Sequence, residues 1–196
     1  MGDLYTGKDL DAVERMSSLT ESLSFKSRFV LLFGEIDHAT ARVACERLIA
    51  LAQNSDAPIT MLISSPGGHV ESGDAIHDLI RFVRAPVTTV GTGWVASAGT
   101  HVFLGAPKER RVCLPNTRFM IHQPSGGAGG QSTDIAIQAK EILRTRERIA
   151  RVIAAETGTA LERVRRDMER DYWMNASEAI EYGIVSRIVE RHTDLG

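Results

Sequence analysis

The sequence has 196 residues, of which 43% are hydrophobic and 24% are charged, and its net charge is −2. This length fits one domain with a sizeable core, and the near-neutral charge gives no reason to expect nucleic acid or an anionic membrane as a partner. No apolar run approaches the ~20 residues of a transmembrane helix, and we expect no targeting peptide in the polar first nine residues. The spacing of Cys45 and Cys113 indicates neither a disulfide framework nor a metal site, so we expect two buried thiols in a reducing compartment. The cytoplasm is the default location.

Taken in chain order, hydrophobic periodicity predicts strands that alternate with helices. Residues 1–27 are polar with scattered apolar positions, and we expect a short helix with a loop, or an arm. Strands are predicted at residues 29–33, 59–63, 86–90, 111–114, 118–121 and 184–189. Helices are predicted between the first three strands, at 98–106, at 132–156, and after two sequences that resemble capping boxes, 159–162 and 175–178. This alternation is typical of one α/β domain with parallel strand pairing.

The helix predicted at residues 132–156 is too long to lie flat on a small sheet. Its face opposite the apolar positions is rich in charged residues. We therefore expect it to project from the domain or to pack against another subunit.

Ser97 is a candidate nucleophile because it lies between small residues where a predicted strand leads into a predicted helix. Such a turn fixes the hydroxyl group and brings backbone N–H groups of the next turn near it, where they can stabilise an oxyanion. The alternative is a packing turn in which Ser97 only caps the helix, since serine is a common N-cap residue.

His122 is the best-placed candidate base, because it ends a predicted strand and precedes Gln123, Pro124 and a glycine-rich loop. An acidic residue that orients the imidazole is expected from the cluster Asp167, Glu169 and Asp171, and spacing does not choose among them. For the other histidines we expect His38 to open a helix, His69 to belong to a glycine turn, His101 to be a satisfied core residue, and His77 and His192 to be solvated.

Two glycine-rich segments, 65–70 and 126–130, follow predicted strands. Each is either an ordinary turn or hinge, or a place where a peptide approaches the bare backbone closely. The sequence has no phosphate-binding glycine motif at a strand-to-helix turn, no HExxH and no CxxC, so we expect no bound nucleotide, other cofactor or metal.

Seven sequence blocks in this order resemble the ClpP family, the proteolytic subunits of the Clp protease. They are 65–68 (SPGG), 93–99 (GWVASAG), 114–116 (LPN), 120–124 (MIHQP), 126–135 (GGAGGQSTDI), 169–172 (ERDY) and 181–183 (EYG). The similarity extends from about Phe29 to Val189. It implies an α/β, crotonase-like single domain with a projecting handle helix, in which residues 28–196 form the serine peptidase domain and residues 1–27 a pore or arm segment.

The resemblance also implies the roles of individual residues. Ser97 is implied as the nucleophile, His122 as the general base and Asp171 as the group that orients it. The backbone N–H groups of Gly68 and Ala98 are implied as the oxyanion hole. Substrate contacts are implied for Gly67, Gly68, His69, Val70, Pro124, Ser125, Gly126 and Gly127, and contacts between rings for Asp134, Glu169 and Arg170.

By the same resemblance, the chain forms a homo-oligomer of two stacked heptameric rings. It cuts peptides alone, and to degrade proteins it needs an AAA+ unfoldase, which is the partner that uses ATP.

The sequence departs from the family pattern at four places. Residues 1–27 show no clear pore loops, and Thr60 and Leu62 stand where tyrosines that dock the unfoldase are usual. Trp94 and Val95 also differ from the family, and Ser125 stands where leucine is common. We therefore hypothesise a divergent paralogue that pairs with a second ClpP isoform. The rival hypotheses are an acyl-CoA hydratase or isomerase of the same broad fold and a catalytically silent ring subunit.

Overall fold

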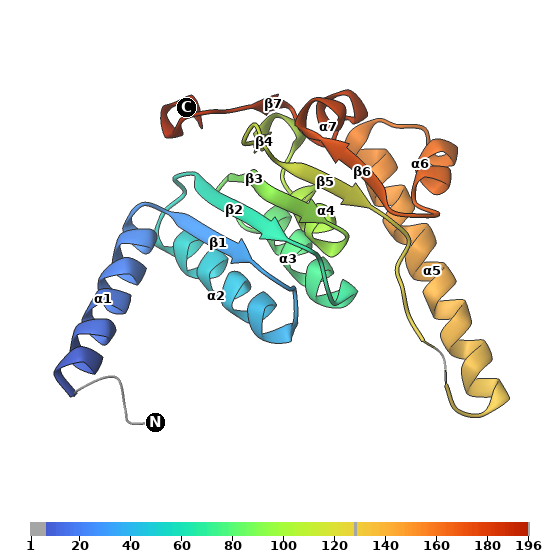
Figure 1. The fold of residues 1–196 in the computed structure, drawn as a ribbon, viewed down its shortest axis with the longest axis horizontal. Coiled ribbons are helices and arrows are strands. Elements are labelled where there is room, and N and C mark those ends of the chain that lie inside the picture. The colour runs from blue at the N-terminus through green and yellow to red at the C-terminus, as the bar shows by residue number, and fades with distance from the viewer. Residues whose placement is uncertain (1–6, 128, 196) are drawn as a thin grey trace.

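The computed structural model describes residues 7–127 and 129–195, and these residues form a seven-stranded sheet with helices packed on it (Figure 1). The main path of the sheet is β1-β2-β3-β4-β7, and β5 pairs with β3 and with β6. All pairs are parallel except β5 with β6. The strands are β1 (Phe29–Phe33), β2 (Ile59–Ser65), β3 (Val87–Ala96), β4 (Arg111–Cys113), β5 (Arg118–Ile121), β6 (Tyr172–Asn175) and β7 (Arg187–Ile188). The predicted α/β class with parallel pairing is confirmed, and one antiparallel strand is added.

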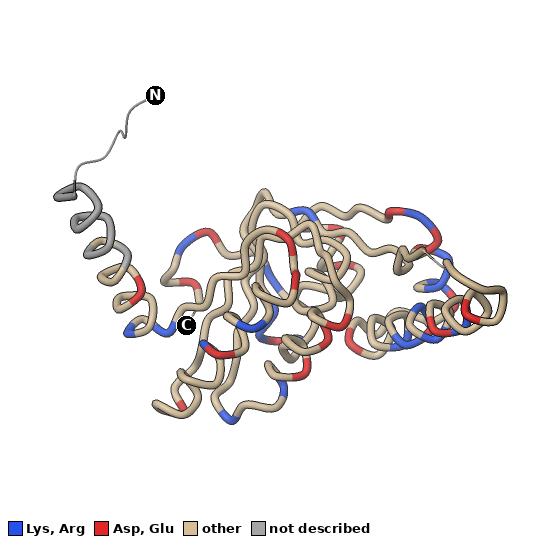
Figure 2. Tube along the Cα trace, turned by 90° about the horizontal axis from the view of Figure 1, so that it is seen from below, with Lys and Arg blue, Asp and Glu red and all other residues tan. Residues whose placement is uncertain are grey.

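Helices α2, α3 and α4 lie on one face of the sheet, and α1 and α5 extend from its two ends (Figure 1). The helices are α1 (Gly7–Lys26), α2 (His38–Asn54), α3 (Val70–Phe82), α4 (Ala98–Phe103), α5 (Ser132–Thr157), α6 (Leu161–Asp167) and α7 (Ala176–Tyr182), with two 3₁₀ turns at Lys108–Arg110 and His192–Leu195. Of α5, only its C-terminal part is buried, at Ala150, Ile153 and Thr157. The expectation of a projecting helix is therefore confirmed. Basic and acidic residues alternate along it (Figure 2).

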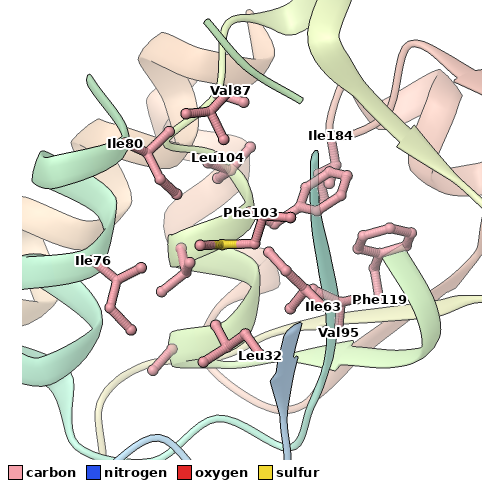
Figure 3. Packing of buried hydrophobic residues seen from close by; sticks show 14 of the residues in the cluster. Leu32, Ile63, Ile76, Ile80, Val87, Val95, Phe103, Leu104, Phe119 and Ile184 are labelled. Atoms are coloured by element: carbon pink, nitrogen blue, oxygen red, sulfur yellow. The ribbon is translucent and has the colours of Figure 1, made fainter. Parts of the chain in front are cut away.

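The main core lies between the sheet and helices α2, α3 and α4. Leu32 and Ile63 from the sheet meet Ile76 of α3 and Phe103 of α4, and all four are fully buried (Figure 3). Phe103 also packs edge-on against Phe119 of β5, with ring centroids 5.1 Å apart. Burial of each such side chain contributes about 1.5–3 kcal/mol, so this core fixes α4 against the sheet.

Strand β3 changes partner along its length. Its first part pairs with β4 at residues 89–91, and its last part pairs with β5 at residues 94–96. Gly91 permits this change, because a Cβ atom there would lie 2.9 Å from the Phe119 ring. The strand is therefore longer than the predicted 86–90, and it delivers Ser97 at its end.

Several local expectations were wrong. For the N-terminal segment, the expected short helix is instead a helix of 20 residues, α1, which extends from the end of the sheet as the alternative of an arm predicts; residues 1–6 lie outside the described part of the chain. Strand β6 was missed, and the last strand is only Arg187–Ile188. Of the two expected capping boxes, the one at Asn175 forms with both of its hydrogen bonds. The one at Thr159 does not, because α6 begins after Ala160 and the Thr159 hydroxyl donates to the Tyr182 carbonyl.

The two cysteines are free thiols. Cys113 is buried, and burial raises the pKa of its thiol to about 11. Cys45 is only partly buried, so the expectation of two buried thiols holds in full for Cys113 alone.

Candidate active site

Ser97 occupies a strained position between β3 and α4. Its φ of 55° is positive, which is rare for a residue other than glycine and is typical of functional turns. The turn is held by the Ser97 N–H, which donates to the Met120 carbonyl at 2.9 Å, and by the Thr100 hydroxyl, which donates to the same carbonyl at 2.8 Å. Ser97 is the N-cap residue of α4, but its side chain makes no capping hydrogen bond, so the hydroxyl is free for another partner.

That partner is His122. Its Nε2 lies 2.7 Å from the Ser97 Oγ, within the range of a hydrogen bond between a nucleophile and its base. His122 directly follows β5, and β5 pairs with the end of β3 at residues 94–96. The two side chains therefore meet because neighbouring parallel strands end side by side.

Asp171 is the acidic residue that the structure places beside His122. The His122 Nδ1 lies 3.2 Å from the Asp171 Oδ1. The cause is the register between β5 and β6, which pairs Ile121 with Tyr172 and so brings the residues just beyond them together. The other two candidates are engaged elsewhere: the Asp167 carboxylate accepts from the Tyr182 hydroxyl at 3.0 Å, and Glu169 lies 3.8 Å from Arg146.

The first glycine segment packs directly against this site. Gly67 and Gly68 have φ values of 99° and 146°, a region that favours glycine. A Cβ atom on Gly67 would lie 2.6 Å from the Ser97 Cβ, and one on Gly68 would lie 2.3 Å from the Ile36 carbonyl oxygen. Gly68 is exposed, and within the described residues its N–H has no hydrogen-bond acceptor. This N–H is therefore available to a ligand at Ser97.

A small cavity of about 30 Å³ opens beside Ser97. It is lined by Val70, Ser97, Ala98, His101, Ile121, His122, Pro124, Ile149 and Ile153. Of the predicted substrate residues, Val70 and Pro124 line this cavity. Gly67, Gly68, His69, Ser125, Gly126 and Gly127 lie outside its lining.

The other residues to which the resemblance assigns a role lie outside the cavity. The His69 ring caps α3 by accepting from the Ser72 N–H at 3.3 Å. Asp134, Glu169 and Arg170 are exposed on the surface of the chain, where a neighbouring subunit can reach them. Ala128, in the second glycine segment, lies outside the described residues.

Sequence reasoning missed a buried polar cluster behind Ser97. His77 was expected to be solvated, but it is buried, and its ring stacks on that of His101 with centroids 4.5 Å apart. His101 was expected to be a satisfied core residue, but only its Nε2 has a partner, the Asp74 carboxylate at 2.9 Å. The signal was present in the helical spacing, because Gly73, His77 and Ile80 share the buried face of α3 with Ile76.

Trp94, one of the departures from the family pattern, does not line the cavity. Its ring lies parallel to that of Trp173 on β6, with centroids 6.4 Å apart. Among the described residues, no group of three or more His, Cys, Asp or Glu side chains is arranged to hold a metal ion, and no helix is long and apolar enough to cross a membrane.

Comparison with known proteins gives consistent matches over most of the chain. The sequence model of a family described as Clp protease matches residues 12–192. The chain is 52% identical over 176 residues to the ATP-dependent Clp protease proteolytic subunit 3 of Rhizobium johnstonii, covering 90% of this chain and 91% of the relative. It is 55% identical over 177 residues to the proteolytic subunit 2 of Gluconobacter oxydans, covering 89% and 79%. Among solved structures, ClpP1 from Listeria monocytogenes superposes with a TM-score of 0.83 at 48% identity, covering 91% of this chain and 99% of that one.

Proposed function

This chain belongs to the Clp protease family and is a proteolytic subunit with the activity of a serine endopeptidase, and on that premise we propose that Ser97, His122 and Asp171 carry out the hydrolysis. The observation that carries the proposal is the 2.7 Å contact between the Ser97 Oγ and the His122 Nε2. The imidazole takes the hydroxyl proton as the Ser97 Oγ attacks the peptide carbonyl carbon, and it then gives this proton to the leaving amine. Water hydrolyses the acyl-enzyme by the same route. Asp171 orients the ring and stabilises the imidazolium.

The negative charge of the tetrahedral intermediate falls on the former carbonyl oxygen. In our proposal the N–H groups of Gly68 and Ala98 donate hydrogen bonds to it. The unpaired, exposed N–H of Gly68 supports this role, and so does the close packing of Gly67 on Ser97.

We further propose that the substrate peptide lies extended between the segment Gly67–Val70 and the chain that follows β5, Pro124–Gly127. Residues 122–127 have no regular secondary structure, and Ser125, Gly126 and Gly127 are exposed. Their backbone groups are therefore available to pair with a peptide strand.

Proteolytic subunits of this family generally form ring oligomers that work with Clp ATPases. For this chain we propose an assembly of two stacked heptameric rings, mixed with a second ClpP isoform. We also propose that it works with an AAA+ unfoldase that hydrolyses ATP, and that it is cytoplasmic. The exposed apolar residues Ile135, Ile137 and Leu143 on the projecting half of α5 support contact between rings. At the sites where docking tyrosines are usual, Thr60 and Leu62 are partly buried on β2, so we expect docking of the unfoldase to differ from the family pattern.

The two rival hypotheses are less well supported. A hydratase leaves the Ser97–His122 pair without a role. A silent subunit does not account for a nucleophile and base already within hydrogen-bonding distance.

The test is cleavage of short fluorogenic peptides together with labelling by a fluorophosphonate. We expect the label on Ser97, and we expect Ser97→Ala to lose activity by roughly 10⁶-fold, as in other serine peptidases. Ser177→Ala is the matched control, because Ser177 is exposed on α7, far in the sequence from the proposed site. Native-like cleavage by Ser97→Ala would refute the proposed mechanism.

A further inference from the structure

The cavity beside Ser97 has apolar walls and one buried polar ring that takes no part in the proposed proton transfer. Val70 of α3, Ile121 of β5 and Ile149 of α5 are among its walls. His101 of α4 also lines it, although only 5% of this residue is exposed. A histidine at this place makes the cavity chemically different from a purely aliphatic one.

The His101 ring is fixed in place by three helices. Its Nε2 lies 2.9 Å from the Asp74 Oδ1 on α3, and both oxygens of Asp74 accept from Arg148 on α5 at 2.7 Å. On one side the ring stacks against His77, with an angle of 15° between the two planes. The imidazole therefore cannot swing out of the cavity wall without breaking these contacts.

The same contacts determine which ring nitrogen carries the proton. Burial alone raises the pKa of Asp74, but the hydrogen bonds from His101 and Arg148 outweigh burial and hold that pKa well below its usual value. The carboxylate is thus an acceptor, and the His101 Nε2–H donates to it. In the neutral ring, Nδ1 is then left as an acceptor. It is buried and has no partner among the described residues.

We propose that His101 is a specificity-determining residue, whose unpaired Nδ1 accepts a hydrogen bond from a substrate side chain that carries an N–H or O–H donor. The side chain concerned is that of P1, the residue whose carbonyl carbon Ser97 attacks. This inference rests on the proposed function. Because the cavity is small, short P1 side chains fit it with least rearrangement. Among side chains that carry an N–H or O–H donor, that of asparagine is closest in shape to leucine. The apolar walls of the cavity accept a leucine side chain at P1, and the hydrogen bond to His101 lets the cavity accept asparagine as well.

The test uses two fluorogenic peptides that are identical except for leucine or asparagine at P1. For native protein we expect kcat/KM for the two peptides to agree within about tenfold. In His101→Leu we expect the leucine-to-asparagine ratio to rise by about tenfold, the size of effect that one buried hydrogen bond produces. In this variant Asp74 keeps both bonds to Arg148 and is not left as a lone buried charge. His192→Leu is the matched control, because it makes the same substitution at an exposed residue that does not line the cavity, and we expect its ratio to equal the native one.

Fluorophosphonate labelling of Ser97 shows whether each variant has a folded site. Should His101→Leu fail to label, His101→Phe provides a flat ring without nitrogen, and we expect the same rise. An unchanged ratio in a labelled His101 variant, an equal rise in His192→Leu, or a native ratio above about a hundredfold would overturn the inference. Failure of native protein to cleave either peptide would instead refute the proposed function.

Discussion

At the scale of single residues, Asp171 is the most weakly held member of the proposed triad. Its side chain is 61% exposed, and its contact with the His122 Nδ1 is 3.2 Å long. Replacing a buried triad aspartate by asparagine lowers kcat by about 10⁴-fold in other serine peptidases, but water screens an exposed carboxylate. We therefore expect Asp171→Asn to lower kcat by about 10²-fold, with little change in KM, in steady-state peptide cleavage. Asp56→Asn, which makes the same change at an exposed residue outside the proposed site, is the control, and an equal loss in that variant would argue against Asp171 as the orienting group.

The sequence by itself pointed to Ser97 and His122, because both follow predicted strands. It left three acidic residues open, and only the family resemblance selected Asp171. The physical reason is that β6 was not predicted from the sequence, and it is the β5–β6 register that brings residue 171 to residue 122. The burial of His77 could have been predicted from the spacing of the buried face of α3. The contacts of Asp74 with His101 and Arg148 could not, because they join helices that are distant in sequence.

At the scale of elements, α7 depends on its N-terminal cap. The Asn175 side chain accepts from the Glu178 N–H at 3.0 Å, and the Glu178 carboxylate accepts from the Asn175 N–H at 2.8 Å. Loss of such a cap costs about 1 kcal/mol. We expect Asn175→Ala to lower Tm by a few degrees in thermal unfolding, whereas Ser177→Ala, in the first turn of the same helix, leaves Tm unchanged. Equal Tm values for the two variants would show that the capping box does not contribute to stability.

Ion pairs that join α5 to its neighbours make the stability of these elements depend on pH. Hydrogen bonds from Arg165 of α6 and from Arg151 lower the pKa of Glu147 to about 2. Because the folded pKa lies below the unfolded value of about 4.3, the stabilisation is complete above pH 5 and is lost as pH falls towards 2. We expect Tm of Glu147→Gln to be lower than native at pH 7 and the two Tm curves to converge only as pH falls to about 2. Glu181→Gln, at an exposed position, is the control, and its curve is expected to run parallel to the native one; a constant gap between Glu147→Gln and native would contradict the role of this carboxylate.

At the scale of the whole molecule, the projecting half of α5 carries apolar side chains that the chain itself does not cover. The sequence predicted that this helix projects or packs against another subunit, because the pattern at residues 132–156 is too long for a small sheet and its opposite face is rich in charged residues. Burial of these side chains against a second ring would contribute about 1.5–3 kcal/mol for each residue and would repeat around the ring.

Leu143 is 62% exposed and is the most exposed large apolar residue described on α5. If rings stack through α5, an aspartate at position 143 places a negative charge in the apolar contact of every subunit. The free-energy cost of removing each carboxylate from water is then summed over all subunits of the ring. We therefore expect Leu143→Asp to halve the mass of the assembly in light scattering coupled to size exclusion. Ala155→Asp adds the same charge at an exposed position near the anchored end of α5, so the double ring is expected to persist in that variant. A full-sized assembly for Leu143→Asp would place the contact between rings elsewhere on the chain, because a helix that only projects into solvent tolerates the charge.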